Sequence, residues 1–176
     1  MKHFLFIRGL PASGKITIAR ELEKKFGWRV LWIHGIKNAI WDVVKKHDLR
    51  ELMRQVLDPI VKFMLDEQMD IIFVRTAMDR ETIDRVREAV AKYPDYRFDL
   101  VTLLADKSTL LDRVKSRPFD EHRPSDEKSL DEYLARIPAH EQHDEHELVL
   151  DTTAMNVDDV VVRICEHFNY TSLLTV

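Results

Sequence analysis

The sequence predicts an α/β fold in three layers, with a five-stranded parallel sheet between two layers of helices and a lid over one edge. Apolar strand-like segments and amphipathic helical segments alternate along the chain, which requires crossover connections between parallel strands. Several strands are also apolar without alternation, such as Ile71-Ile72-Phe73-Val74, as expected where helices cover both faces of a sheet. No repeat or dividing linker interrupts the pattern, so residues 1–176 are expected to form one domain.

The first strand, expected over Phe4–Arg8, leads into a glycine-bounded loop and then a helix over Lys15–Phe26. The loop reads Gly-Leu-Pro-Ala-Ser-Gly-Lys, and this strand–loop–helix context is that of a phosphate-binding P-loop. Glycine permits the tight curl that turns successive backbone N–H groups inward, toward a polyphosphate at the positive end of the helix. Glycines that only punctuate a turn are the structural alternative. The expected nucleotide-binding residues are Gly9, Ala12, Ser13, Gly14, Lys15, Ile16 and Thr17.

Residue 16 departs from the usual P-loop, in which Ser or Thr follows the lysine and its hydroxyl binds Mg²⁺. Ile16 offers no oxygen to a hard cation, so Thr17 is the candidate Mg²⁺ ligand. Two interpretations stay open. Adenylate kinases resemble this pattern and hold Mg²⁺ through phosphates and water; otherwise the site binds nucleotide and turns it over poorly. Nucleotide binding is expected in both cases, because the backbone amides and Lys15 do not depend on residue 16.

The same patterns predict the remaining elements. Asp58-Pro59 is a good N-cap and first-turn pair, so two helices are expected to meet there, and Gly27 is placed to end the first helix with a left-handed cap. The further strands are expected over Arg29–Ile33, Asp70–Arg75, Phe98–Ala105 and Glu147–Leu150. The further helices are expected over Ile36–Lys46, Leu49–Leu57, Pro59–Gln68, Arg80–Lys92, Ser108–Arg117, Leu130–Glu141 and Val157–Phe168.

Composition limits the classes of function. The chain is 45% hydrophobic and 33% charged, as in globular proteins, and its net charge of −4 argues against a dedicated nucleic-acid binder. Cys165 is the single cysteine, which excludes an intrachain disulfide and a cysteine zinc site, and a small buried role is expected for it. The sequence has no apolar run of membrane-spanning length and begins with a strand pattern, so we expect a cytoplasmic protein with no membrane partner.

Ligands of open α/β sheets bind beyond the carboxyl ends of the strands, so the residues that follow each strand define a candidate site. Both cations and carboxylates are expected at this edge, a combination that suits the positioning of a phosphoryl group. After the P-loop, these residues are His34, Gly35, Lys37, Arg75, Thr76, Asp79, Asp106, Asp151 and Thr152.

The segment Arg117–Lys128 has two prolines, mixed charge and no periodicity. Loops of this length in compact domains are often active-site lids, so we expect a lid over about residues 117–140, and residues 170–176 are expected to form a C-terminal tail. Helical spacing puts Arg113 and Arg117 on one helix face, although ordinary solvated arginines would give the same pattern.

Residues 3–168 resemble the small P-loop kinases, and most closely the group of polynucleotide 5′-kinases, chloramphenicol phosphotransferase and zeta toxins. The P-loop carries the resemblance, together with Leu-Leu-Asp-Arg-Val-Lys-Ser-Arg at residues 110–117, which is similar to the start of the family's lid. The resemblance implies that Arg113, Arg117 and Arg123 close over ATP phosphates. In that group an aspartate acts as general base after the second strand, and an arginine follows three residues later. The matching residues here are His34 and Lys37.

The family pattern Asp-x-Thr-Asn after the third strand is Val74-Arg75-Thr76-Ala77 here, which keeps only the threonine. The resemblance therefore implies a kinase that uses ATP and Mg²⁺, with His34, Lys37 and Arg75 at a small-molecule or nucleotide acceptor. Whether His34 is a base or a polar strand-end residue stays open. The alternative function is a nucleotide-binding module of the same fold with weak or no phosphotransfer, acting as a sensor or partner-binding protein. The oligomeric state is left open.

Two further patterns have two interpretations each. The run from His140 to Glu147 spaces histidines three residues apart beside carboxylates, as in some metal sites, but a charged linker is the usual role of such a segment. Trp41 follows the second strand, where it would either pack in the core or line an acceptor pocket.

Overall fold

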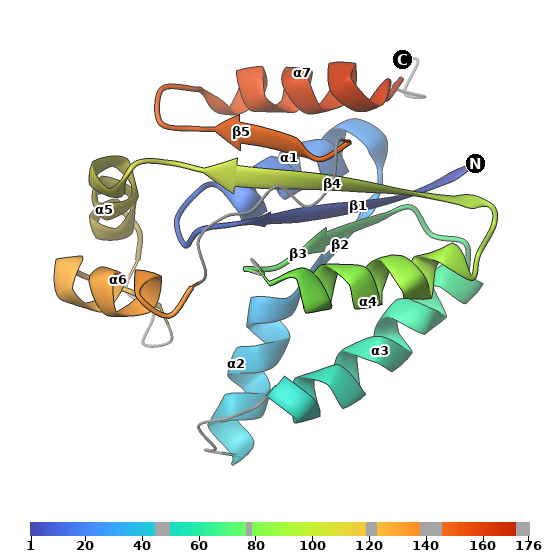
Figure 1. Ribbon diagram of the computed structural model, residues 1–176, viewed down its shortest axis with the longest axis horizontal. Coiled ribbons are helices and arrows are strands. Elements are labelled where there is room, and N and C mark those ends of the chain that lie inside the picture. Colours follow the sequence, from blue (N-terminus) through green and yellow to red (C-terminus); the bar gives the residue numbers. More distant parts are fainter. Residues whose placement is uncertain (45–49, 77–78, 119–122, 138–145, 172–176) are drawn as a thin grey trace.

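The computed structural model describes residues 1–44, 50–76, 79–118, 123–137 and 146–171 (Figure 1). The strands are β1 (Lys2–Gly9), β2 (Arg29–Trp32), β3 (Ile71–Val74), β4 (Tyr96–Leu104) and β5 (Leu148–Asp151). The helices are α1 (Lys15–Phe26), α2 (Ile33–Val44), α3 (Arg50–Asp66), α4 (Arg80–Ala91), α5 (Lys107–Ser116), α6 (Glu127–Leu134) and α7 (Val157–Phe168).

The five strands form one parallel sheet in the order β2-β3-β1-β4-β5, which confirms the predicted three-layer α/β fold. Helices α1 and α7 cover one face, and α2, α3 and α4 cover the other (Figure 1). The central strand β1 contributes to both cores, with Phe4 and Phe6 on the α2–α4 side and Leu5 and Ile7 on the α1/α7 side. All four side chains are fully buried, which explains why this strand is apolar without alternation.

Helices α5 and α6 lie beyond the carboxyl end of β4, apart from the two main layers (Figure 1). Leu110 and Val114 of α5 pack with Leu130 of α6 in a small separate core, which Leu10 and Ala12 of the P-loop also join. This core therefore connects the segment expected to form the lid to the loop expected to bind phosphate.

The expected break at Pro59 is wrong, because α3 is one helix with Pro59 inside it. A proline within a helix costs about 3 kcal/mol or more. The residues Met53, Leu57, Val61 and Leu65 recur at a spacing of four and are all buried against the sheet, each contributing roughly 1.5–3 kcal/mol. This continuous apolar stripe outweighs the cost. Asp58 therefore caps no helix and instead lies 3.5 Å from the Arg85 guanidinium of α4.

Among the element boundaries that differ from the sequence prediction, two concern the site and the expected lid. Helix α2 begins at Ile33, directly after β2, so His34 lies in the first turn of a helix rather than at a strand end. Helix α6 ends at Leu134, before the expected Glu141, which is outside the described residues. The left-handed cap at Gly27 is confirmed, with φ of 73° and its N–H donating to the Glu23 carbonyl at 2.7 Å.

Tyr170, the first residue of the expected C-terminal tail, is anchored to the domain by its side chain. After a left-handed cap at Asn169, the Tyr170 side chain is buried against Trp28. Its hydroxyl donates to Asp99 Oδ2 at 2.7 Å, and Arg97 donates to the same oxygen at 2.8 Å. Residues 172–176 are outside the described part of the chain.

We predict that Tyr170→Phe lowers the free energy of unfolding by about 1.5–3 kcal/mol, because it removes a buried hydrogen bond to a carboxylate. Urea denaturation followed by circular dichroism measures this loss. Tyr93→Phe is the matched control, since the Tyr93 hydroxyl donates to Asp66 at the same distance of 2.7 Å but at the surface. Equal losses in the two variants would contradict a special role for the buried bond.

Candidate nucleotide and acceptor site

The P-loop begins at Gly9, the last residue of β1, with φ of 146°. A Cβ atom at Gly9 would lie 2.1 Å from the Leu103 carbonyl oxygen of β4, so only glycine fits there. Gly14 also has a positive φ, 93°, at the N-cap of α1. Ala12 takes the left-handed region as well, with φ of 61°, although it carries a Cβ atom. Three residues from Gly9 to Gly14 thus have positive φ angles, where the chain passes from its strand to its helix.

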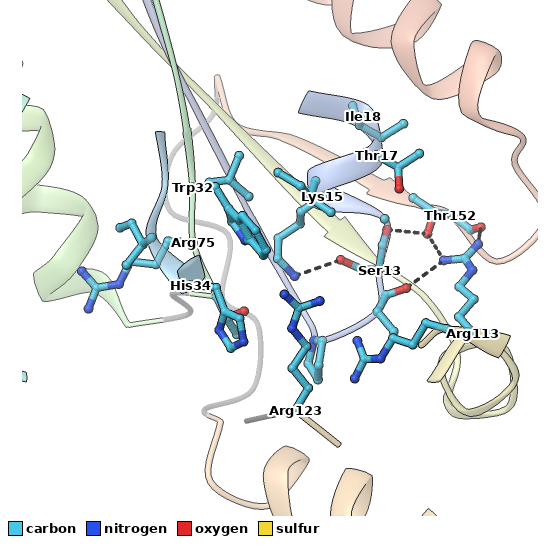
Figure 2. Close-up of a pocket in the computed structure, with 18 of the residues that line it drawn as sticks. Ser13, Lys15, Thr17, Ile18, Trp32, His34, Arg75, Arg113, Arg123 and Thr152 are labelled. Carbon is cyan, nitrogen blue, oxygen red and sulfur yellow. Dashed lines mark hydrogen bonds between the residues drawn. The ribbon is translucent and has the colours of Figure 1, made fainter. Parts of the chain in front are cut away.

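Lys15 lies at the start of α1 and its ammonium turns back over the loop (Figure 2). It donates to the Leu10 carbonyl and lies 3.5 Å from Ser13 Oγ. Burial, together with the smaller effect of the positive charges of Arg117 and Arg123, lowers the pKa of Lys15 to about 7. These three cations therefore lie near one another without a carboxylate among the described lining residues to compensate them. A polyphosphate in the pocket would bring negative charge to this group of cations.

A pocket of about 950 Å³ opens in front of the P-loop, at the carboxyl ends of β1, β2 and β3. It brings together the predicted P-loop residues from Ala12 to Thr17 and the predicted cationic residues with His34, whereas Gly9, Gly35 and the three predicted aspartates do not line it. The cationic residues that line it are Lys15, Lys37, Arg75, Arg113, Arg117 and Arg123. No Asp or Glu is among its described lining residues.

Arg113 is held by protein groups. Its Nη1 donates to Thr152 Oγ1 at 3.0 Å, and its Nη2 donates to the Thr152 carbonyl at 2.7 Å (Figure 2). The Thr152 hydroxyl lies 3.3 Å from the Ser13 carbonyl and 2.9 Å from that of Leu104. Arg113 thus ties α5 to the residue after β5 and to the P-loop, a role that sequence reasoning did not assign to it.

Two arginines of the segment Arg117–Lys128 reach the pocket. Arg117 donates through Nη2 to the Pro124 carbonyl and so joins the two described ends of the segment. The Arg123 guanidinium carbon lies 5.1 Å from the centroid of the Trp32 ring, a cation–π contact, and Figure 2 shows it directed toward Lys15. Residues 119–122 of the expected lid are outside the described part of the chain.

His34 lies beside Trp32, with ring centroids 6.0 Å apart, at the part of the pocket away from the P-loop. Lys37 follows one turn later on α2, Arg75 extends from the end of β3, and Met53 and Leu57 of α3 add apolar surface. We call this part the acceptor end. Trp41, which sequence reasoning considered as a lining residue, packs against the core instead. Trp32 is the lining tryptophan, and its place as the last residue of a strand was the signal that could have identified it.

The carboxylates that were expected at this edge serve as helix caps and turn acceptors. Asp79 accepts from the Thr82 amide at 2.8 Å, Asp106 from the Thr109 amide at 2.6 Å, and Asp151 from the Thr153 amide at 2.9 Å. The hydrogen bonds to Thr109 lower the pKa of Asp106. None of these three side chains lines the pocket. These aspartates follow their strands at one edge of the sheet, as expected, but their side chains accept hydrogen bonds from the protein and do not line the pocket.

Among the described residues, no three His, Cys, Asp or Glu side chains lie close enough together to hold a metal ion. Most of the run His140–Glu147 is outside the described part, while Glu147 accepts from buried Arg8, with Nη2 at 2.6 Å. Thr17 is exposed and lines the pocket beside Ile16. The residues present fit a Mg²⁺ ion held mainly by phosphates and water, with the Thr17 hydroxyl as the side-chain donor. Across the described residues, no helix is long and apolar enough to cross a membrane.

A family model described as an AAA domain matches residues 4–140, so the chain belongs to this family of P-loop NTPases. No curated protein matches the sequence. A sugar kinase from Janibacter sp. has a similar structure, with 21% identity, a TM-score of 0.71 and coverage of 96% of this chain and 95% of that chain. A gluconokinase from Sinorhizobium meliloti 1021 has 16% identity, a TM-score of 0.65 and coverage of 95% of each chain.

The tunicamycin resistance protein of Deinococcus radiodurans is also similar, with 14% identity, a TM-score of 0.66 and coverage of 97% of this chain and 98% of that chain. At these identities the similarity establishes the fold. The predicted fold of a small P-loop kinase is thereby confirmed.

The lowered pKa of Lys15 predicts how the ligand-free protein responds to pH. Lysine in the unfolded chain has a pKa of about 10.4, so between about pH 7 and pH 10 the unfolded chain binds more protons than the folded one. The free energy of unfolding therefore receives a contribution from Lys15 that increases with pH in this range, and Lys15→Met removes it. Denaturation from pH 6.5 to 9 measures the difference between wild type and variant, with exposed Lys24→Met as control. A difference that is flat with pH would contradict the shift.

Proposed function

We propose that this protein is an ATP-dependent kinase that transfers the γ-phosphoryl group to a small-molecule or nucleotide acceptor. The observation that carries the proposal is a single pocket in which the P-loop lysine and the lid arginines share space with His34, Lys37 and Arg75. An enzyme that only hydrolysed nucleotide would not need the acceptor end. The AAA domain family and the fold of sugar kinases support a transfer of this type.

In the proposed complex, the backbone N–H groups from Ala12 to Ile16 surround the phosphates at the N-terminus of α1. Lys15 exchanges its hydrogen bond to the Leu10 carbonyl for one to a phosphate oxygen. Arg117 and Arg123 stabilise the charge that develops on the transferred group. Arg113 acts differently from the family expectation, because its hydrogen bonds hold Thr152 and the P-loop in place. Mg²⁺, when bound, neutralises phosphate charge, with Thr17 as the residue that would hold it.

At the acceptor end, His34 is the candidate general base for a hydroxyl acceptor, since no carboxylate is among the described lining residues. Its place in the first turn of α2 fixes the imidazole beside Trp32. Lys37 and Arg75 line the same pocket and would orient the acceptor. A kinase of this type would work in the cytoplasm, where ATP is supplied.

The alternative is a nucleotide-binding module with weak or no phosphotransfer. Ile16 favours it, because the residue lines the pocket at the position where P-loops usually have a metal-binding hydroxyl. The two functions differ in one measurement: a module binds nucleotide and releases no ADP above background with any acceptor, whereas a kinase releases ADP in proportion to the acceptor phosphorylated.

We predict that ATP or ADP with Mg²⁺ raises the melting temperature of the protein. At a hundredfold excess over Kd the stabilisation is about 2.7 kcal/mol. This is a shift of roughly 5–10 °C for a domain of this size. Lys15→Ala is expected to remove most of the shift, and Lys24→Ala, on the exposed side of α1, is expected to retain it. Differential scanning fluorimetry measures both. The absence of a shift at millimolar nucleotide would contradict the proposal.

We also predict that Ile16→Ser lowers the Mg²⁺ concentration needed for half-maximal nucleotide binding by roughly fivefold, equivalent to about 1 kcal/mol. The new hydroxyl supplies the oxygen donor that Ile16 lacks. Titration of Mg²⁺ at fixed ATP measures the change. Ile16→Ala is the matched control, because it shortens the side chain without adding an oxygen. If all three proteins give the same midpoint, Thr17 and water already complete the metal site.

A further inference from the structure

The pocket has a charge opposite to that of the chain as a whole. Six cationic side chains line it, and its described lining residues include no Asp or Glu, although the net charge of the chain is −4. Like charges in a partly enclosed space repel one another, and a cleft with walls of low dielectric strengthens their field. A pocket of this kind concentrates anions from solution. The question is how many of its cations the nucleotide accounts for.

Four of the cations belong to the nucleotide end. Lys15, Arg117 and Arg123 lie near one another, since the charge of each arginine lowers the pKa of Lys15. Arg113 is bound to Thr152 beside the P-loop. Arg75 lies elsewhere, and Figure 2 shows it extending from the end of β3 away from Lys15. Arg75 and Lys37 are therefore two cations that the phosphates of a nucleotide do not need.

Arg75 has charged neighbours, but none of the described residues accepts a hydrogen bond from its side chain. The carboxylates whose charge reaches it are Asp79 and Asp58, while Arg85 acts on it as a like charge. Asp79 accepts from the Thr82 amide at 2.8 Å, and Asp58 lies 3.5 Å from Arg85 Nη1. Among the described residues, no group accepts a hydrogen bond from the Arg75 guanidinium, although this side chain is partly buried. A guanidinium in this situation is suited to a bidentate contact with a carboxylate or phosphate ligand.

Lys37 is the second cation of the acceptor end. It lies three residues after His34, so the two side chains share a face of α2, and both line the pocket. Lys37 is exposed and makes no ion pair with any residue in the described ranges. A ligand bound by Lys37 and Arg75 would therefore share the pocket with the His34 imidazole.

We infer that the acceptor of the phosphoryl group is itself an anion, a small molecule whose carboxylate or phosphate group is bound by Arg75 and Lys37. This inference rests on the proposed kinase function and names the class of its second substrate. An oxygen of the acceptor forms a bond to the γ-phosphorus of ATP while the bond from that phosphorus to the bridging oxygen breaks, and ADP leaves. If the oxygen is a hydroxyl, its proton passes to His34. If it is a phosphate oxygen, it is already deprotonated and no base is required.

The experiment measures anion binding at the acceptor end with the nucleotide site already filled. The protein is saturated with a non-hydrolysable ATP analogue and Mg²⁺, and inorganic phosphate, malonate or neutral glycerol is then titrated at constant ionic strength. The melting temperature is expected to rise further with phosphate or malonate and to stay constant with glycerol. The anion that acts at lower concentration distinguishes a phosphate-bearing from a carboxylate-bearing acceptor.

Arg75→Gln and Lys37→Gln are each expected to weaken this second binding at least tenfold and to leave the shift due to the nucleotide analogue unchanged. Arg80→Gln is the matched control, because Arg80 is exposed at the start of α4 and does not line the pocket. Since the Arg75 guanidinium has no acceptor within the described residues, Arg75→Gln is expected to fold with a melting temperature equal to or above that of wild type.

The inference would be overturned if phosphate and malonate do not raise the melting temperature of the protein already saturated with the nucleotide analogue. It would also be overturned if they raise it equally in wild type and Arg75→Gln. If the nucleotide analogue itself does not raise the melting temperature, the proposed kinase function is contradicted instead. Phosphate and malonate can then be titrated without the analogue. The two failures are thus distinguishable. Assays of ADP release with matched acceptors provide the functional counterpart: gluconate or glucose 6-phosphate is expected to exceed neutral glucose in wild type, and Arg75→Gln is expected to remove the preference.

Discussion

The whole site depends on the contact between Gly9 and the Leu103 carbonyl, where the chain leaves the sheet. The two strands are paired at this point, and a Cβ atom on Gly9 would lie 2.1 Å from the carbonyl oxygen. Strands β1 and β4 are held between two buried cores, so they cannot move apart to admit a side chain. The starting point of the P-loop is therefore fixed, and the direction of α1 and the position of Lys15 follow from it.

Polar contacts below and beside the loop hold the strand ends in register. Arg8 precedes Gly9, and its guanidinium donates to Glu147 and to Thr102, all three side chains being buried. Such an ion pair adds little net stability relative to apolar residues, but loss of one partner would leave a buried charge uncompensated. Together with Arg113 and Thr152, this pair joins β1, β4, β5 and α5 around the phosphate-binding loop. Side-chain contacts between distant segments therefore support the P-loop from below, and the cations of the pocket lie in front of it.

Local motifs and strand order made much of this arrangement predictable from the sequence. The P-loop is a contiguous motif, and residues after parallel strands must share one edge, so His34, Lys37 and Arg75 could be named in advance. Features that depend on packing between distant segments could not. Three features depend on contacts between elements far apart in the chain: the buried apolar stripe that keeps α3 continuous across Pro59, the hydrogen-bond partners of Arg113, and the position of Trp32 rather than Trp41 in the pocket. The roles of the aspartates that follow strands could not be decided from the sequence, since an aspartate at such a position can either cap a helix or bind a ligand.

The cation–π contact between Arg123 and Trp32 has a spectroscopic consequence. Trp28 is buried in stacked contact with His3, and Trp41 packs on the core, so both indoles lie away from the pocket. Trp32 is the tryptophan whose surroundings change if Arg123 moves from its ring to a phosphate. Its emission spectrum and its quenching by iodide are therefore expected to report the position of Arg123, which gives the protein an intrinsic fluorophore for following this side chain in real time without a chemical label.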